Sequence, residues 1–358
     1  MPETRVLLAA HGEAETAGFR DNFRISWHTL AHASEVMRLP APLRVLICTF
    51  GGLRKRFGGG SGSPHNAHTR AQAAALEARL NAGGAGSNHD RDGDGDGDGD
   101  RCRYRVEPVF ASAPPYLDDA VCLPEGVDRQ LIVNMIPTDS RLSCGLGCHA
   151  LLAEPSCARE RTRVIARFWE SPELIGVHCD HVAEHFPTLE SEGDCCLVLV
   201  LHGTVVRDEK GRPPAYHSGE AEKTIYGEAL KSALMARPDR PWQRVELAYL
   251  NHGVGGEWSS PALPDLLTRL GEEGIGTAVA YACEHLVDGG ETLGLKDVLA
   301  AGPVPESHSL PCLNANPALI EFLAGRIEAA STASPCDLRC DPCPLRAKPS
   351  QLVKGASR

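Results

Sequence analysis

Two apolar runs in the sequence end in a histidine followed by a glycine, a residue pair that could do chemistry. His202 and Gly203 close the run "LVLVL", and His11 and Gly12 close the run "VLLAA" about half a chain earlier. A neutral imidazole has one nitrogen free to accept a proton near neutral pH, and glycine leaves room for a flat ligand to approach. The pairs therefore predict proton-transfer or metal-binding positions, although a satisfied surface histidine is an equally good interpretation of either one.

The elements that must hold these histidines are strands and helices in alternation. Apolar runs of strand length occur at Arg5–Ala10, Leu43–Phe50, Tyr104–Phe110, Leu131–Ile136, Val164–Phe168, Leu197–Leu201, Val245–Leu250 and Ala278–Ala282. Amphipathic stretches of helical period lie at 69–84, 218–237, 260–274 and 316–331. This alternation predicts an α/β fold with parallel sheets, in which ligands bind beyond the carboxyl ends of the strands. Both histidines occupy such ends.

Length and charge restrict the classes of function. The 358 residues have room for two domains, and a hydrophobic content of 42% is enough for a core. The net charge is −11, and the run "DRDGDGDGDGD" at 90–100 holds six Asp against one Arg. No basic patch with interleaved aromatic residues occurs, so the sequence predicts no nucleic-acid partner.

Hydropathy and cysteine usage indicate the cellular compartment of the protein. Near the start only Val6–Ala10 is uninterrupted apolar sequence, too short for a signal peptide, and the longest run, Cys195–Leu201, is too short for a membrane span. Most of the fourteen cysteines stand singly in apolar contexts, as packed free thiols do in a reducing compartment. We therefore expect a cytoplasmic protein with no transmembrane segment.

Four motifs resemble one known family, in the same order along the chain. They are "RKRFGGGSGSPHNAHTRAQAAAL" (54–76), "LVLVLHG" (197–203), "CEHLVDGGETLGLKD" (283–297) and "PCLNANPALIEFLAGRI" (311–327), with Trp258 in "NHGVGGEW" as a further match. Each motif is weak alone, but four in order are hard to obtain by chance. The chain resembles the ferrochelatases over nearly its whole length.

The resemblance implies a chelatase-like α/β fold of two similar Rossmann-like domains, each with a four-stranded parallel sheet flanked by helices. We expect the first domain at 1–172, with a disordered Asp-Gly insert at 81–103. The second domain, at 173–312, would carry the catalytic residues. A C-terminal helix at 313–331 would pack back on the first domain, and a cysteine-containing tail would follow at 332–358.

The resemblance also implies a reaction, the insertion of Fe²⁺, as a substrate, into protoporphyrin IX or coproporphyrin III. Because two pyrrole N–H protons must leave, the site needs a base aimed at the ring centre. His202 matches the family's proton acceptor, Glu291 its acidic partner and His285 its motif histidine, and these three would contact the metal. The residues expected to border the porphyrin are His11, Gly12, Gly203 and Trp258. Membrane contact and the oligomeric state are left open.

Departures from the family keep other functions open. Ala111 and Ser112 stand where the family often has Arg-Tyr against the porphyrin, and Val287–Gly290 separates His285 from Glu291. The chain could instead be a chelatase for cobalt or nickel and a sirohydrochlorin-type tetrapyrrole, or a non-catalytic porphyrin- or haem-binding protein. Without the resemblance, an exposed carboxylate at a helix start would be the preferred interpretation of Glu291.

A cysteine group near the C-terminus adds a cofactor prediction. Cys336, Cys340 and Cys343 supply three thiolates, and a cluster needs a fourth ligand. Several ferrochelatases hold a [2Fe–2S] cluster with a C-terminal cysteine group and one cysteine of the first domain. Cys144 is the first candidate for that fourth ligand and Cys148 the second. A zinc site on the same cysteines and a tail of free thiols are the alternatives.

Overall fold

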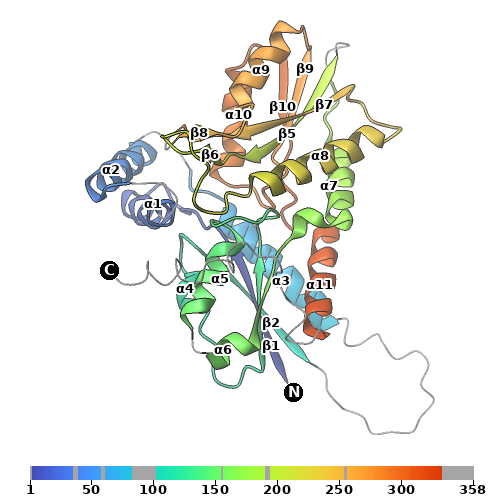
Figure 1. The fold of residues 1–358 in the computed structure, drawn as a ribbon. Helices are drawn as coiled ribbons and strands as arrows, with labels where there is room; N and C mark the ends of the chain where they lie inside the picture. The colour runs from blue at the N-terminus through green and yellow to red at the C-terminus, as the bar shows by residue number, and fades with distance from the viewer. Residues whose placement is uncertain are drawn as a thin grey trace, which may run out of the picture.

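Two parallel β-sheets of four strands each form the centres of the two halves of the molecule (Figure 1). The computed structural model describes residues 2–34, 39–57, 61–82, 102–154, 156–189, 194–253 and 256–332. The first sheet has the order β2-β1-β3-β4, with β1 (Glu3–Ala10), β2 (Arg103–Phe110), β3 (Arg129–Asn134) and β4 (Thr162–Ile165). The second has the order β10-β9-β5-β7, with β5 (Cys195–His202), β7 (Arg244–Leu250), β9 (Thr277–Tyr281) and β10 (Glu306–Ser309). Neighbouring strands in both sheets are parallel.

Helices flank both sheets. The first half has α1 (Phe19–Ala33), α2 (Ala41–Phe57), α3 (His65–Ala82), α4 (Leu117–Ala120), α5 (Cys144–Ala153) and α6 (Ser156–Arg161). A short turn, η2 (Phe168–Glu170), leads to α7 (Pro172–His185), α8 (Glu220–Ala236), α9 (Leu263–Glu272), α10 (Gly290–Ala300) and α11 (Pro317–Thr332), and β6 (Val205–Arg207) pairs antiparallel with β8 (Glu257–Trp258). The predicted fold class, α/β with parallel four-stranded sheets flanked by helices, is confirmed. Among the described helices, none is long and apolar enough to cross a bilayer.

Strand β5 shows why the second half folds around its sheet. Residues 195–201 are all fully buried, and alternate side chains point to opposite faces. Leu197 and Leu199 pack in one core with Tyr226 of α8, whereas Val198 packs in another with Leu266 of α9. The continuous apolar run in the sequence therefore reflects burial on both faces, as in a sheet covered by helices on each side.

Helix α11 returns to the first half of the molecule, as Figure 1 shows. Arg79 of α3 lies 2.7 Å from the Glu321 carboxylate, and Arg326 donates a hydrogen bond of 3.3 Å to the Ala166 carbonyl oxygen. The rings of Phe322 and Phe168 pack edge to face with centroids 5.2 Å apart. These contacts tie the chain's last described helix to the first sheet.

The sequence predictions left several helices out, among them α1 and α7, and they differ from the structure in two further elements. The run Leu43–Phe50 is not a strand but lies inside the 17-residue helix α2. A short apolar run fits a strand and a helix equally well, and in α2 the buried residues are Cys48 and Gly52. Strand β10 was missed because its sequence, "ESHS", has no apolar run, a pattern tolerated at the edge of a sheet.

The expected Asp-Gly insert at 81–103 falls mostly on residues 83–101, outside the described residues. Its two ends are described and lie together. The Asn81 side chain, near the end of α3, donates a hydrogen bond of 2.9 Å to the Tyr104 carbonyl oxygen and accepts one of 3.1 Å from the Tyr104 N–H. The helix and the strand are therefore joined directly at the base of the insert.

Candidate active site

Three neighbouring strands of the second sheet lead to histidines at one edge. His202 is the last residue of β5, His252 follows β7 and His285 follows β9. Since β9, β5 and β7 are adjacent and parallel, their carboxyl ends meet and bring the imidazoles together. The ring centroid of His202 lies 5.0 Å from that of His252 and 6.3 Å from that of His285.

One carboxylate, that of Glu291, faces all three histidines. Its Oε1 lies 3.8 Å from His202 Nε2 and 3.4 Å from His252 Nε2, and its Oε2 lies 3.4 Å from His285 Nε2. Ligand atoms of His202, His252 and Glu291 all lie within 4.8 Å of one another, a spacing from which three protein ligands could hold a metal ion. These side chains are 36% to 49% exposed, so a ligand can reach them.

The four inserted residues before Glu291 are held in place. Asp288 accepts hydrogen bonds from the Asn314 side chain (2.7 Å) and the Cys312 N–H (3.1 Å). Gln72 of α3 donates a bond of 2.7 Å to the Asn314 carbonyl oxygen. Helix α10 begins at Gly290, the last residue of this segment, and Glu291 lies in its first turn, where the helix dipole favours an anion.

Hydrogen bonding determines which nitrogen of His202 is free. Its Nδ1 lies 2.7 Å from the Gly203 carbonyl oxygen, which can only accept, so Nδ1 carries the hydrogen and Nε2 keeps its lone pair. Burial lowers the pKa of His202 to about 4, because the charge of Glu291 only partly offsets it and that of Lys223 adds to it. At neutral pH His202 is therefore a neutral base whose free nitrogen faces Glu291 and His252.

Glu291 and His285 shift each other's pKa in opposite directions. Burial would raise the pKa of Glu291, but the neighbouring imidazoles, led by His202, hold it well below its usual range. Burial would likewise lower the pKa of His285, but its hydrogen bond to Glu291 and the charge of that residue raise it. The site thus combines an anionic carboxylate, a histidine whose pKa that carboxylate raises and a neutral imidazole base.

A buried ion pair supports the backbone of His202. Lys223 Nζ, on α8, lies 3.0 Å from the Glu284 carboxylate and donates a bond of 2.6 Å to the His202 carbonyl oxygen. Glu284 accepts a bond of 2.8 Å from the His202 N–H and another from the Thr138 hydroxyl of the first half. The Lys223 and Glu284 side chains are 6% and 3% exposed, so two buried charges hold the peptide groups of His202 from both sides.

Two of the residues expected to border a porphyrin lie near this cluster. Trp258 of β8 packs edge-on against the His252 ring, with centroids 5.5 Å apart. His11 follows β1 in the first half; burial lowers its pKa, and the charges of Glu13 and, less strongly, Glu291 oppose that change. The Ser112 N–H donates a bond of 2.8 Å to the His11 carbonyl oxygen, so a small residue lies beside His11.

The glycines after His11 and His202 are required by packing. Gly12 has a φ of +82°, and a Cβ there would lie 2.5 Å from the Cβ of Phe110. A Cβ on Gly203 would lie 1.8 Å from Asn251 Oδ1. These close approaches account for both glycines, and their contact with a substrate stays a prediction.

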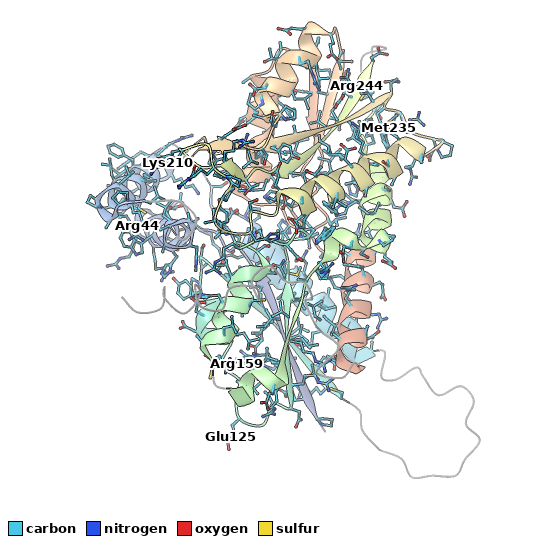
Figure 2. The ribbon with its side chains drawn as sticks, viewed as in Figure 1. Arg44, Glu125, Arg159, Lys210, Met235 and Arg244 are labelled. Atoms are coloured by element: carbon cyan, nitrogen blue, oxygen red, sulfur yellow. The ribbon has the colours of Figure 1, made fainter. Side chains whose placement is uncertain are left out.

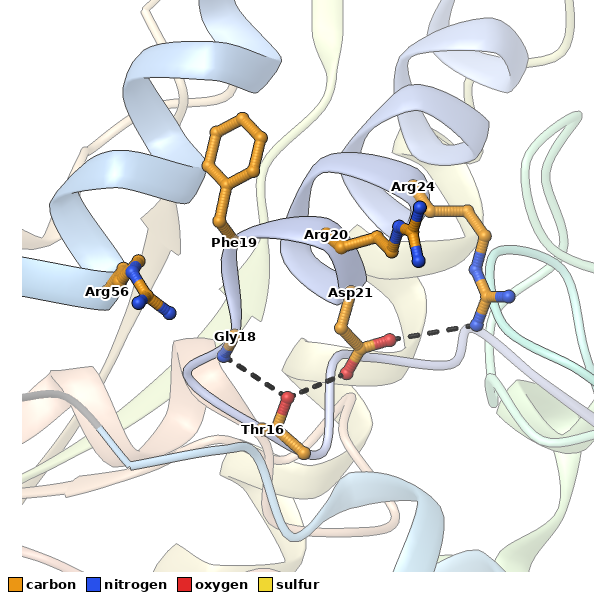
Figure 3. A pocket seen from close by; sticks show the side chains of 7 residues that line it. All are labelled: Thr16, Gly18, Phe19, Arg20, Asp21, Arg24 and Arg56. Atoms are coloured by element: carbon orange, nitrogen blue, oxygen red, sulfur yellow. Dashed lines mark hydrogen bonds and ion pairs between the residues drawn. The ribbon is translucent and has the colours of Figure 1, made fainter.

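An open pocket of about 810 Å³ lies where α1 begins, facing the end of α2 (Figure 3). Arg20, Arg24 and Arg56 bring three guanidinium groups to it, against the single carboxylate of Asp21. Asp21 accepts a hydrogen bond of 3.2 Å from Thr16 and lies 3.7 Å from Arg24. The excess of positive charge suits a ligand that carries carboxylates.

The predicted cluster ligands are only partly described. Cys144 is buried at the start of α5, and Cys148 lies one turn further along. Cys336, Cys340 and Cys343 lie outside the described residues. The cluster therefore stays a prediction.

His252 is the site residue that the sequence analysis missed. It stands in "NHGVGGEW", where a histidine-glycine pair follows the apolar run Val245–Leu250. The same signal singled out His11 and His202. A search for every strand that ends near a histidine-glycine pair would have found it.

Two α/β halves, with imidazoles and a carboxylate gathered at the strand ends of the second, define a chelatase-like protein. The chain belongs to the ferrochelatase family, whose model, described as Ferrochelatase, matches residues 3–331. The resemblance inferred from the sequence motifs is thereby confirmed.

Individual relatives are distant in sequence. A ferrochelatase of Synechocystis is 24% identical over 337 residues, which cover 87% of this chain and 79% of the relative, and one of Rippkaea orientalis is 23% identical over 84% of this chain and 76% of its own. Two solved structures give a TM-score of 0.46. They are CbiX, titled as the terminal enzyme for the biosynthesis of siroheme in denitrifying bacteria (16% identity, 91% of this chain, 99% of that chain), and SirB from Bacillus subtilis with Fe³⁺ (10% identity, 94% and 99%).

Proposed function

We propose that this protein is a ferrochelatase that inserts Fe²⁺, its substrate metal, into a porphyrin, protoporphyrin IX or coproporphyrin III. Membership of the family supports the class of reaction. The observation that carries the proposal is the unprotonated Nε2 of neutral His202, which lies within hydrogen-bond distance of His252 Nε2 (3.1 Å) and 3.8 Å from Glu291 at an accessible end of the sheet.

In this proposal His202 accepts the protons that the porphyrin releases. Each pyrrole N–H that is replaced by the metal must give up a proton, and the lone pair on Nε2 can take it. The anionic carboxylate of Glu291 stabilises the imidazolium that results. The exposed ring of His252 then passes the proton to solvent, and two such transfers balance the two positive charges of the incoming ion.

The same groups would hold the metal before it enters the ring. His252 and His202 offer imidazole nitrogens and Glu291 offers an oxygen, a ligand set that suits first-row divalent ions. His285 binds the other oxygen of Glu291 and so, in our proposal, orients the carboxylate for the metal.

The arginine-lined pocket at α1 would receive the carboxylates of the porphyrin. It lies in the loop and helix that follow His11, and Arg20 and Arg56 could supply charge where the family's Arg-Tyr pair is replaced by Ala111 and Ser112. Charge-assisted bonds from guanidinium groups to carboxylates would then fix the orientation of the ring.

We also propose peripheral contact with an anionic membrane surface, through α2. The helix projects to one side of the molecule (Figure 1), and Figure 2 shows the Arg44 side chain on it. Seven of its large apolar side chains are 38% to 77% exposed, namely Leu43, Val45, Leu46, Ile47, Phe50, Leu53 and Phe57. The helix has no acidic residue and ends in Arg54, Lys55 and Arg56, the composition of an interfacial helix.

The cytoplasmic location and the [2Fe–2S] cluster remain proposals that rest on the sequence. Cys144 and Cys148 offer two thiols one helical turn apart as the fourth ligand to Cys336, Cys340 and Cys343. An absorbance spectrum of anaerobically purified protein tests the cluster, and its chromophore should be lost in the Cys340→Ser variant.

Metal insertion by the purified protein tests the proposal. Initial rates are measured anaerobically with Fe²⁺, Co²⁺, Ni²⁺ and Zn²⁺, against protoporphyrin IX, coproporphyrin III and sirohydrochlorin. We expect Fe²⁺ and a porphyrin to give a rate well above the uncatalysed background. A preference for Co²⁺ or Ni²⁺ with sirohydrochlorin would assign the protein to the related chelatases. Background rates with every pair would leave only a porphyrin-binding protein.

A further inference from the structure

Glu13 reaches from the first half of the molecule to the helix that carries Glu291. Its Oε2 accepts a hydrogen bond of 2.8 Å from the Gly290 N–H, although the two residues stand 277 positions apart in the sequence. The bond joins the loop after β1 to the first turn of α10. It therefore links the two halves next to the proposed site.

The N-cap residue of helix α10 offers no capping side chain, although Thr292 Oγ1, in the first turn, accepts a hydrogen bond of 2.8 Å from the Gly289 N–H. Its N-cap residue is Gly289, which has no side-chain acceptor, and the first N–H groups of a helix need acceptors from outside the helix. The carboxylate of Glu13 supplies one from a distant part of the chain. It does so at the residue directly before Glu291.

Two glycines make room for this carboxylate. A Cβ on Gly289 would lie 2.7 Å from Glu13 Oε1, and a Cβ on Gly290 would lie 3.1 Å from Glu13 Oε2. Both glycines belong to the four inserted residues, Val287–Gly290, that precede Glu291. The insertion that distinguishes this chain from the family motif is thus matched in shape to Glu13.

Glu13 is itself held firmly. Asn66, 2% exposed at the start of α3, accepts a bond of 2.9 Å from the Glu13 N–H and donates one of 2.8 Å to the Glu13 carbonyl oxygen. Burial would raise the pKa of Glu13, but the neighbouring His65, the Ser63 hydroxyl and the Gly290 N–H lower it. The cap is therefore an anion on a fixed backbone.

We propose that Glu13 is a positioning residue that caps α10 from the opposite half of the molecule and thereby holds Glu291 against His202 and His252. The inference rests on the proposed function, because it treats Glu291 as a working residue of the site. It assigns a purpose to a carboxylate that none of the family motifs includes.

Three variants distinguish loss of the helix cap from loss of the negative charge and from general destabilisation. Glu13→Ala removes the acceptor, and Glu13→Gln keeps an amide oxygen in its place. Glu15→Ala removes a carboxylate of the same loop that binds Arg70 at 2.8 Å and Asn66 at 3.2 Å, both on α3. We measure the affinity for Co²⁺ alone by titration of its visible absorption, and amide hydrogen exchange of the peptide that contains Gly290. Thermal unfolding shows that each variant is folded.

Glu13→Ala should weaken Co²⁺ binding about fivefold, the change in an equilibrium constant that corresponds to the loss of one N-cap. It should also accelerate hydrogen exchange at the start of α10. Glu13→Gln should stay within about twofold of the unmodified protein, and Glu15→Ala should match it. Glu13→Ala with unchanged Co²⁺ affinity and unchanged exchange would overturn the proposal.

A compensating substitution tests the geometry directly. Gly289→Ser alone should weaken Co²⁺ binding, because the new Cβ collides with Glu13, whereas the same change combined with Glu13→Ala should restore it by supplying a local cap. A double variant as weak as Glu13→Ala would contradict the capping role. An unmodified protein that inserts no metal would refute the proposed function, but the Co²⁺ and exchange results would still decide the role of Glu13.

Discussion

Nε2 of His252 lies 3.1 Å from Nε2 of His202, although the two residues stand 50 positions apart and follow different strands. Because Nδ1 of His202 carries its hydrogen, the lone pair on Nε2 is available to a donor or to a cation. Glu291 places a negative charge beside both nitrogens. The pair is therefore suited to share a metal ion between two imidazoles and one carboxylate.

Loss of His252 should weaken this metal site without unfolding the protein. We expect His252→Gln to reduce Co²⁺ affinity at least about tenfold, the scale on which supporting residues of metal sites act. His308→Gln, at the far edge of the same sheet, removes an imidazole bound to Glu306 at 2.7 Å and should leave the affinity unchanged. Equal affinities for His252→Gln and the unmodified protein would remove His252 from the site.

Much of this arrangement could be predicted from the sequence because it follows from local patterns. The buried run before His202 identified β5 and its end. His252 follows the same rule, because a histidine-glycine pair comes directly after the apolar run of β7 and Asn251. The role of Asp288 and Glu13 in holding the inserted residues could not be predicted, because each acts through contacts across long sequence separations.

In helix α2 the sequence pattern itself led to a wrong prediction. Its apolar run Leu43–Phe50 predicted a strand, because a run of that length fits a strand as well as a helix. The structure leaves Phe50 and Phe57 exposed by 65% and 77%. Only the three-dimensional contacts reveal that this run faces outward. Its interpretation therefore changes from a strand to the exposed face of a helix.

The outward face of α2 should bind anionic lipid. Replacing Phe50 and Phe57 by Ser should reduce co-sedimentation with phosphatidylglycerol vesicles by about tenfold or more per residue, because each phenyl ring loses apolar burial. Leu152→Ser, at a site on α5 that is 51% exposed, is the matched control and should have no effect. Equal binding to neutral vesicles would contradict the role of the basic residues. A dimer that the substitutions dissociate would assign the face to a second copy of the chain.

The buried Lys223–Glu284 pair should be essential for stability. Lys223→Met leaves the Glu284 carboxylate buried without its partner, which should cost about 3–5 kcal/mol of the free energy of unfolding. Adding Glu284→Gln should recover much of that loss in urea denaturation. Lys231→Met, on the same helix with a 3.9 Å contact to Glu246, should cost about 1 kcal/mol or less. If the loss of unfolding free energy in the double variant equalled the sum of the losses in Lys223→Met and Glu284→Gln, the two residues would not be coupled.

The stability of the fold should fall with acid because of His178. Its ring lies between the hydroxyls of Tyr281 (2.6 Å) and Tyr226 (2.7 Å), and burial lowers its pKa from 6.5 to about 3. Between these two values the unfolded chain binds more protons than the folded one, so this stabilising contribution is complete above pH 6.5 and is lost as the pH falls.

The variant His178→Gln should have a shallower dependence of unfolding free energy on pH. Between pH 4 and 6 its slope should be smaller by up to about 1.4 kcal/mol per pH unit, the value for one proton. Urea denaturation at several pH values measures it. An unchanged slope would mean that His178 does not stay neutral in the folded protein.

The initial rate of Fe²⁺ insertion into a porphyrin by the His202→Gln variant tests the central claim most directly. Measured anaerobically at saturating metal beside His308→Gln, kcat should fall by about a hundredfold or more, the contribution of a positioned general base. The circular dichroism spectrum of the variant should be unchanged. A kcat within twofold of the unmodified protein would show that another group takes the pyrrole protons.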